Sequence, residues 1–253
     1  MKAIILAAGV GKRFQTITDQ RPKCLIQVSG KTLLERTLTA LGAAGVTEAV
    51  IVIGYRGDMI VEEIGERCGT VAVRYIRNEQ YEKGAILSLW SARNEFDTDL
   101  LIMDADVLFP IRLLQRLVQS RHASCFLLDA SSENTGEEQM LLTRAGRVVT
   151  IIRGGAGDYD LVGESVGFLK VAQDAAPLLR AILDDCVAQG RDTIEHEEAF
   201  PEFLAQHHVG FERVDDLPWT EIDFPQDLEH AERDILPDIE RLDALDEGSG
   251  IGN

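Results

Sequence analysis

The sequence predicts an α/β fold in which one doubly wound, mostly parallel sheet is joined to a smaller lobe of mixed structure. Short apolar segments alternate with longer segments of helical periodicity through the first half of the chain. Glycines follow several of these apolar segments, where a strand must turn into a loop or helix. The second half adds a hairpin-like pair of segments, which predicts the mixed lobe.

The first half is expected to form a series of βαβ units. Strands are predicted over residues 3–6, 49–53, 71–76, 100–103 and 125–128. Helices are predicted between them, over residues 33–41, 59–67, 86–96 and 111–120. Strands separated by helices usually run parallel, because the helix returns the chain to the same end of the sheet.

The second half is predicted to combine a hairpin with three helices. The hairpin covers residues 138–143 and 148–152 and turns at Ala145-Gly146, and further strands are expected over 166–171 and 210–214. The helices are expected over 175–188, 195–206 and 225–235. Residues 1–236 are therefore interpreted as one Rossmann-like domain, and residues 237–253 as an acidic tail that we expect to be disordered.

The charge balance restricts the classes of partner. Lys and Arg total 25 while Asp and Glu total 43, which gives a formal net charge of −18. Such a surface repels a phosphate backbone, so DNA or RNA is not the expected partner. A small anionic substrate would need a local group of basic residues and backbone amides to bind against this field.

The cysteines and the N-terminal segment predict a cytoplasmic protein without membrane insertion. Cys24, Cys68, Cys125 and Cys186 form no CxxC pair, so reduced thiols are expected. The apolar run at residues 3–8 is too short to span a membrane and lacks a signal-peptide cleavage region. The oligomeric state cannot be predicted from these features.

A glycine-rich turn with basic residues follows the first predicted strand. Its small residues would let backbone amides approach a ligand, and the segment contains Leu6, Ala7, Ala8, Gly9 and Gly11. Arg13 adds a planar charged group and Lys23 a point charge suited to phosphates. The spacing differs from the Rossmann and Walker motifs, and a GxG alone is also typical of an ordinary βα turn.

Acidic residues follow another predicted strand and recur in a late segment. Asp104 and Asp106 stand at the carboxyl end of strand 100–103, the usual ligand crevice of an open parallel sheet. Glu221 and Asp223 lie two residues apart, so an extended backbone would point them to one side. Asp106, Glu221 and Asp223 together would suit Mg²⁺, which prefers oxygen ligands. The alternatives are turn capping at the strand end and an N-cap to the helix near residue 225.

These motifs resemble those of the nucleotidyltransferase family that makes sugar nucleotides and CDP-alcohols. The match begins with the string LAAGxGxRF from Leu6 and the following Pro22-Lys23, continues with residues 30–36 and 52–55, and includes 103–107 and 219–223. It is close over residues 1–110 and loose beyond. The resemblance implies a Mg²⁺-dependent transfer of a nucleoside monophosphate to a phosphorylated acceptor, with Arg13, Lys23 and Asp106 as catalytic residues.

Within that family the chain most resembles the phosphocholine and phospho-alcohol cytidylyltransferases. Residues 77–81 and 84–89, the Asp-Ala-Asp strand end and the late Glu-Ile-Asp carry this resemblance. It implies CTP as the nucleotide, with a base pocket formed by the backbone from Leu6 to Gly9 and by the helix start from Gly84 to Ser88. A sugar-1-phosphate or inositol-1-phosphate enzyme using another triphosphate is the alternative. A catalytically silent nucleotide-binding regulator ranks below both.

The acceptor is expected to be a small phosphorylated alcohol, and the resemblance suggests a cationic headgroup. Six acids cluster in the predicted acceptor region, and they are Asp158, Asp160, Glu164, Glu195, Glu197 and Glu198. Quaternary ammonium sites usually also need aromatic faces, and the region offers only Tyr159, Phe168, Phe200 and Phe203. The alternative interpretation is that these acids are solvated surface. Structural or surface positions are predicted for the histidines, which are His122, His196, His207, His208 and His230.

Overall fold

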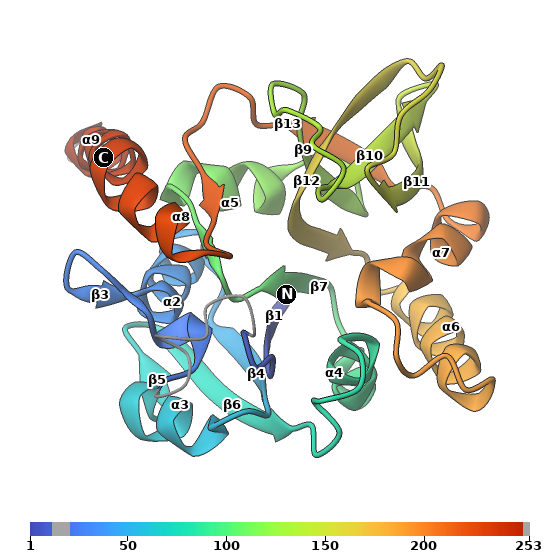
Figure 1. The fold of residues 1–253 in the computed structure, drawn as a ribbon, viewed down its shortest axis with the longest axis horizontal. Helices are drawn as coiled ribbons and strands as arrows, with labels where there is room; N and C mark the ends of the chain where they lie inside the picture. The colour runs from blue at the N-terminus through green and yellow to red at the C-terminus, as the bar shows by residue number, and fades with distance from the viewer. Residues whose placement is uncertain (12–20, 250–253) are drawn as a thin grey trace.

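A mixed sheet runs through the molecule and carries helices on both faces (Figure 1). The structure is a computed structural model and describes residues 1–11 and 21–249. The strands of this sheet are β1 (Lys2–Ala7), β4 (Glu48–Ile53), β5 (Arg67–Cys68), β6 (Val71–Arg77), β7 (Leu100–Asp104), β9 (Cys125–Asp129), β10 (Gln139–Arg144), β11 (Arg147–Arg153), β12 (Leu161–Val171) and β13 (Gly210–Arg213). Their main order is β11-β10-β12-β7-β1-β4-β6-β5, with β9 beside β12 and β13 beside β9.

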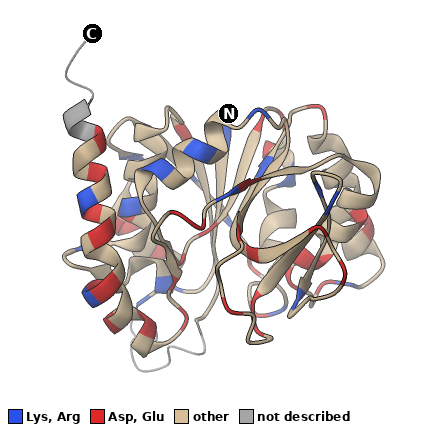
Figure 2. Ribbon diagram, turned by 90° about the horizontal axis from the view of Figure 1, so that it is seen from above, with Lys and Arg blue, Asp and Glu red and all other residues tan. Residues whose placement is uncertain are grey.

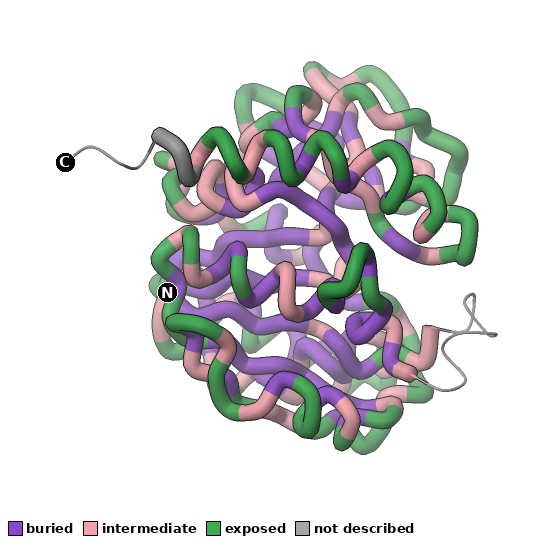
Figure 3. Tube along the Cα trace, turned by 90° about the vertical axis from the view of Figure 1, so that its left-hand side faces the viewer, coloured by how far each residue is buried: buried purple, intermediate pink, exposed green. Residues whose placement is uncertain are grey.

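The half of the sheet built from β7, β1, β4 and β6 is parallel, as the sequence predicts. Strands β1, β4 and β7 are buried on both faces, which explains their continuous apolar composition, whereas β6 exposes Arg74 and Arg77. The helices are α2 (Leu33–Ala43), α3 (Gly57–Ile64), α4 (Ile86–Ser91), α5 (Ile111–Gln119), α6 (Ala176–Ala188), α7 (Phe200–Gln206), α8 (Pro225–His230) and α9 (Leu236–Ser249). Ile5 and Ile51 face the layer of α2, α3 and α5, whereas Ile4 and Val50 face that of α4, α6 and α7. Figure 3 shows the buried strands between the more exposed helices.

The other half of the sheet is largely antiparallel and is held to the first by β12. The C-terminal part of β12 pairs with β7, and its N-terminal part pairs with β10. The strand bends between these parts, where its register against β9 shifts and Gly167 has a φ of +82°. A Cβ at Gly167 would lie 2.5 Å from Oδ2 of Asp104, so glycine lets the bend pass close to that carboxylate.

Several predicted elements differ from the structure at their ends. The helix expected over residues 86–96 ends as α4 at Ser91 and continues only as a one-turn 3-10 helix, Arg93–Glu95. The helix expected over 195–206 begins with a 3-10 turn, His196–Ala199, before α7. The strand expected over 166–171 begins five residues earlier, at Leu161. That added part carries polar residues that face a cavity, so no apolar run marks it.

The C-terminal segment differs from the predicted disordered tail, because Leu236–Ser249 form helix α9. Leu236 and Ile239 are buried against the body of the protein. Asp243 accepts a hydrogen bond from the backbone N–H of Ile111, and Asp246 forms an ion pair with Arg112, so α9 is attached to the start of α5. An acidic composition therefore did not prevent this segment from packing.

Charge is spread over the whole molecule, as Figure 2 shows. Acids outnumber basic residues on α9, and other acids lie on the loops between the two halves of the sheet. The four cysteines are free thiols. Within residues 1–11 and 21–249, none of the helices combines the length and the apolar character that crossing a lipid bilayer requires.

Candidate active site

A cavity of about 1030 Å³ opens where the parallel strands end, between the two halves of the sheet. One wall comes from the turn after β1 and from the segment around the start of α4. The opposite wall comes from β12, the 3-10 turn after Glu195 and the loop after β9. The carboxyl ends of parallel strands are the position that the sequence predicts for a ligand site.

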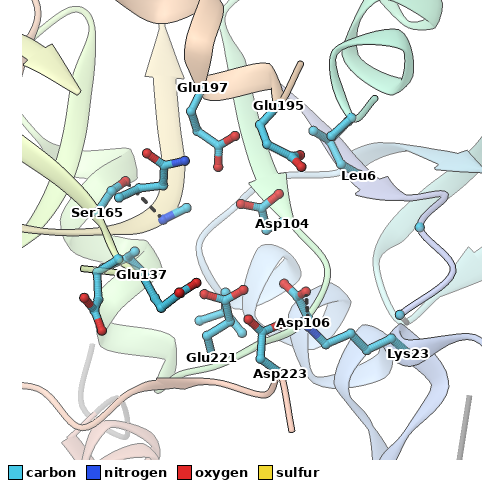
Figure 4. Close-up of a pocket in the computed structure, with 18 of the residues that line it drawn as sticks. Leu6, Lys23, Asp104, Asp106, Glu137, Ser165, Glu195, Glu197, Glu221 and Asp223 are labelled. Carbon is cyan, nitrogen blue, oxygen red and sulfur yellow. Dashed lines mark hydrogen bonds and ion pairs between the residues drawn. The ribbon is translucent and has the colours of Figure 1, made fainter. Parts of the chain in front are cut away.

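Asp106, Glu221 and Asp223 are brought together in this cavity (Figure 4). Asp106 directly precedes the short strand β8 (Val107–Leu108), and Glu221 belongs to β14 (Thr220–Glu221). These strands pair antiparallel, and the N–H of Ile222 donates to the carbonyl oxygen of Asp106 at 3.0 Å. The pairing places one ligand atom from each of the three acids within 4.8 Å of the others. Their function as metal ligands stays a prediction.

Lys23 reaches the same group from a 3-10 turn, Lys23–Leu25. Its Nζ donates to Oδ2 of Asp106 at 2.6 Å and also forms an ion pair with Asp223. Burial opposes the charged form of Lys23, but the two carboxylates outweigh it and raise the pKa of its ammonium. Lys23 is therefore a charged group at the centre of the cavity, as a phosphate-binding role requires. Arg13, the other predicted catalytic cation, lies outside the described residues.

The three acids have the properties of a cation site. Oδ1 of Asp106 is buried and has no hydrogen-bond partner within residues 1–11 and 21–249. Glu221 can be reached by solvent from the cavity, yet its burial in the surrounding protein, together with Asp106 and Asp223, raises its pKa to about 8. One ammonium cannot balance three carboxylates, and an unpartnered buried oxygen is costly. The residues therefore fit a hard divalent cation, which takes oxygen ligands.

A second group, formed by Asp104, His196 and Glu197, is more buried than the first. Nδ1 of His196 is 3.1 Å from Oε2 of Glu197, and Nε2 is 3.8 Å from Oδ1 of Asp104. Burial, followed by the charges of Glu197, Asp106 and Glu221, raises the pKa of Asp104 well above its usual range. A cation placed here would favour the ionised form of these acids.

His196 was not expected beside Asp104 from the sequence. Structural or surface positions are predicted for every histidine, but His196 is buried beside the cavity. A local signal does exist, because His196 stands in an uninterrupted acid–His–acid run from Glu195 to Glu198. The sequence places Asp104 at the strand end, with turn capping as the alternative, and the bend at Gly167 brings the opposite wall against it.

The six predicted acceptor-site acids divide into two groups. Glu164, Glu195 and Glu197 line the cavity, and Figure 4 shows Glu195 and Glu197 pointing toward Asp104. The remaining acids, which are Asp158, Asp160 and Glu198, do not line it. Glu198 instead accepts a hydrogen bond from the N–H of Glu195, and Asp160 accepts one from the N–H of Ala145. The aromatic side chains that line the cavity are Tyr81, Trp219 and Phe224, whereas none of the four aromatics of the predicted acceptor region lines it.

The predicted nucleotide wall is also divided. Most of its predicted members line the cavity, and these are Leu6, Ala8, Gly9, Gly11, Lys23 and Ser88. Ala7 and Gly84 do not line it; the side chain of Ala7 belongs to the core. Gly84 packs against the opposite wall, since a Cβ there would lie 2.5 Å from the carbonyl oxygen of Ile194. Because Gly84 has no side chain, the start of α4 can pack closely against the segment that carries Glu195.

This sheet, its glycine turn and its acidic strand end define a nucleotidyltransferase. The family model described as MobA-like NTP transferase domain matches residues 3–209, and the chain belongs to this family. The predicted fold class and enzyme class are thereby confirmed.

Relatives with known names include several cytidylyltransferases. The 2-aminoethylphosphonate cytidylyltransferase of Lancefieldella rimae is 31% identical over 209 residues, which are 82% of this chain and 80% of that protein. The choline-phosphate cytidylyltransferase of Haemophilus influenzae is 27% identical over 95% of this chain and 100% of its own length. Other relatives are longer, and the chain spans 40% of one of them and 52% of another. The solved structure of CTP:phosphocholine cytidylyltransferase from Streptococcus pneumoniae has a TM-score of 0.74 at 24% identity and covers 91% of this chain and 97% of that one.

Proposed function

We propose that the protein transfers CMP from CTP to a small phosphonate or phosphorylated alcohol that carries a primary ammonium group, with release of pyrophosphate. The observation that carries this proposal is the single cavity in which a backbone-lined wall, a lysine–carboxylate centre and an acidic wall face one another. The named cytidylyltransferases among the relatives support CTP as the nucleotide.

Asp106, Glu221 and Asp223 are the proposed ligands of a magnesium ion. When bound, magnesium neutralises charge on the phosphates as pyrophosphate leaves. Lys23 adds a fixed ammonium beside Asp106, and the N–H groups of the turn containing Gly9 can donate to phosphate oxygens. These contacts position the triphosphate within an otherwise acidic protein.

The chemical step needs alignment more than acid–base chemistry. An oxygen of the acceptor phosphate or phosphonate attacks the α-phosphorus of CTP, and the bond from that phosphorus to the bridging oxygen breaks. The electron pair of the broken bond leaves with pyrophosphate. The acceptor oxygen is already anionic at neutral pH, so no base has to activate it. The protein contributes in-line positioning and charge neutralisation.

The acidic wall favours a primary ammonium headgroup. Asp104, Glu195 and Glu197 approach one region of the cavity, and each carboxylate can accept an N–H hydrogen bond (Figure 4). A quaternary ammonium has no N–H to donate and is usually held by aromatic faces. We therefore expect an amino-phosphonate or a phosphorylated amino alcohol to be a better acceptor than phosphocholine. One relative is named for 2-aminoethylphosphonate.

Pyrophosphate release from purified protein tests this function. The four nucleoside triphosphates would each be combined with 2-aminoethylphosphonate, phosphoethanolamine, phosphocholine, inositol 1-phosphate or glucose 1-phosphate, with Mg²⁺ or with EDTA. We expect turnover with CTP and the two primary amines, and none with EDTA. Turnover with a hexose 1-phosphate alone would contradict the proposal, and so would full activity in EDTA.

A further inference from the structure

Ser88 has a fixed hydrogen-bond partner behind the cavity wall. Ser88 lies in α4 and lines the cavity, while Asn78 follows the last residue of β6 and does not line it. Nδ2 of Asn78 donates to Oγ of Ser88 at 3.1 Å. Both residues are buried, with 3% of Asn78 and 6% of Ser88 exposed, so bulk water does not compete for this contact.

The orientation of the Asn78 amide is set by the backbone. The N–H of Gln80 donates to Oδ1 of Asn78 at 2.9 Å, which identifies that atom as the oxygen. The N–H of Asn78 in turn donates to the carbonyl oxygen of Ile53 at 2.8 Å, so its main chain is attached to β4. The NH₂ group must therefore be the end that faces Ser88.

This arrangement decides what the Ser88 hydroxyl can offer to a ligand. A hydroxyl has one hydrogen and two lone pairs. Asn78 occupies one lone pair and offers no acceptor in that direction. Among residues 1–11 and 21–249, no acceptor for the Ser88 hydroxyl hydrogen is found. The cavity side is where that hydrogen can find a partner, so Ser88 presents a donor to a ligand there.

Cytosine and uracil differ in what they present to such a donor. The N3 atom of cytosine is an acceptor, whereas N3 of uracil or thymine carries a hydrogen. A donor facing N3 would bond to cytosine and would meet a second donor in uracil. Buried polar groups that are left unpaired in this way discriminate strongly between otherwise similar substrates.

We propose that Asn78 makes Ser88 a hydrogen-bond donor, and that this donor reads N3 of the base and selects cytosine over uracil. This inference rests on the proposed function, because it takes CTP as the nucleotide and assumes that its base lies against Ser88. Asn78 is a positioning residue, since it acts through Ser88 and does not line the cavity.

Nucleotide binding to the full chain, measured by titration calorimetry with Mg²⁺, tests the contact from the ligand side. We expect CTP to bind more tightly than UTP. A 3-deaza analogue of CTP, which has C–H in place of N3, should bind about 10- to 100-fold more weakly than CTP. In Ser88→Ala the analogue and CTP should bind alike, because the donor has been removed.

Asn78→Asp tests the contact from the protein side. The carboxylate still accepts from the N–H of Gln80, but toward Ser88 it offers an acceptor in place of a donor. The Ser88 hydroxyl would then turn its hydrogen toward Asp and a lone pair toward the cavity. The ratio of CTP to UTP affinity should fall at least about tenfold. Gln80→Ala is the matched control, because it keeps the backbone N–H and changes only an exposed side chain.

The outcomes separate this inference from the proposed function. If the unchanged protein does not prefer CTP to UTP, the proposed nucleotide itself is wrong. If it prefers CTP while Asn78→Asp weakens both nucleotides equally and the 3-deaza analogue binds like CTP, only the inference about Asn78 and Ser88 is wrong. If Asn78→Asp does not fold, which its thermal unfolding would show, the 3-deaza comparison still decides the matter.

Discussion

The wall built from the parallel half of the sheet offers the backbone of the glycine turn, Ser88 and the segment from Tyr81 to Lys83, whereas the wall built from the antiparallel half offers mostly carboxylates. The first wall includes Leu6, Gly9 and Ser88, and the second includes Glu164 and Glu197. The lysine–carboxylate centre lies between them. The walls thus differ in the charge of the group that each can receive.

This difference shows how an acidic protein can bind two anionic substrates. Backbone N–H groups and Lys23 can hold the triphosphate without adding many basic side chains. The acidic wall would repel an acceptor that carries only a phosphate, but it would attract one that also carries an ammonium group. The same acids therefore favour one end of the acceptor and help to orient it.

Asp106→Asn changes the lysine–carboxylate centre that lies between the two walls, and we expect this substitution to have the largest effect on turnover. The side chain keeps its shape but loses a hard anionic ligand, so turnover should fall by about 10²- to 10³-fold. Steady-state pyrophosphate release measures this, with circular dichroism to show that the fold persists. Asp58→Asn is the control, because Asp58 is an exposed residue of α3 that forms an ion pair with Arg77. Near-normal magnesium-dependent rates in Asp106→Asn would remove Asp106 from the site.

Lys23→Ala tests whether the nucleotide wall depends on this one cation. Turnover at saturating CTP should fall about 10²-fold, because the ammonium is most useful as charge develops on the departing pyrophosphate. Lys31→Ala changes an exposed lysine of β3 (Lys31–Thr32) and should leave turnover unchanged. A rise in the KM for CTP without any loss of kcat would mean that Lys23 only helps ground-state binding.

Glu197→Gln tests the acidic wall by itself. Removing one charged acceptor should raise the KM for 2-aminoethylphosphonate by about 10- to 100-fold and leave the KM for CTP nearly unchanged. Asp158→Asn provides a matched control, since Asp158 is another of the six acids predicted for the acceptor site but does not line the cavity. Equal effects of the two substitutions would show that the acidic wall does not contact the headgroup.

Glu95→Gln changes the opposite end of β1, far from both walls, and should affect stability alone. Glu95 bonds to Arg74 of β6 and to Lys2 of β1. The hydrogen bond from Arg74, followed by Lys2, lowers the pKa of Glu95 to about 2. We expect a loss of about 1 kcal/mol at pH 7, because solvent at the exposed Arg74 screens part of the interaction.

The sign of the pH dependence provides the check on Glu95. A carboxyl whose pKa is lower in the folded state stabilises the fold above its usual pKa near 4.5. That contribution is lost as the pH falls from 4.5 towards 2. The difference in unfolding free energy between the two proteins should therefore be constant from pH 6 to 8 and shrink below about pH 4.5. A difference that grows in acid, or a changed kcat at pH 7, would contradict this assignment.

The parallel half could be predicted from the sequence, because β1, β4 and β7 are apolar on both faces. In β1 and β4 every residue from Ala3 to Ile5 and from Ala49 to Ile53 is buried, so the run itself identifies a central strand. The glycine turn and the acids at the strand end could also be predicted, because each directly follows one of these apolar strands in the sequence. Local composition determined which chemistry could be present, namely backbone donors, Lys23 and carboxylates.

Only the tertiary structure decided which of these residues meet. The pairing of β8 with β14 joins Asp106 to Glu221 and Asp223, which lie far apart in the sequence. The bend at Gly167 and the 3-10 turn of His196 place Asp104 and Glu197 together, while Asp158 from the same acidic region stays outside. Helix α9 packs its buried Leu236 and Ile239 against apolar residues that include Ile26, Leu33 and Leu108, although its composition suggested disorder. Secondary-structure propensity depends on residues that are close in sequence, whereas contacts between distant segments depend on the path of the whole chain.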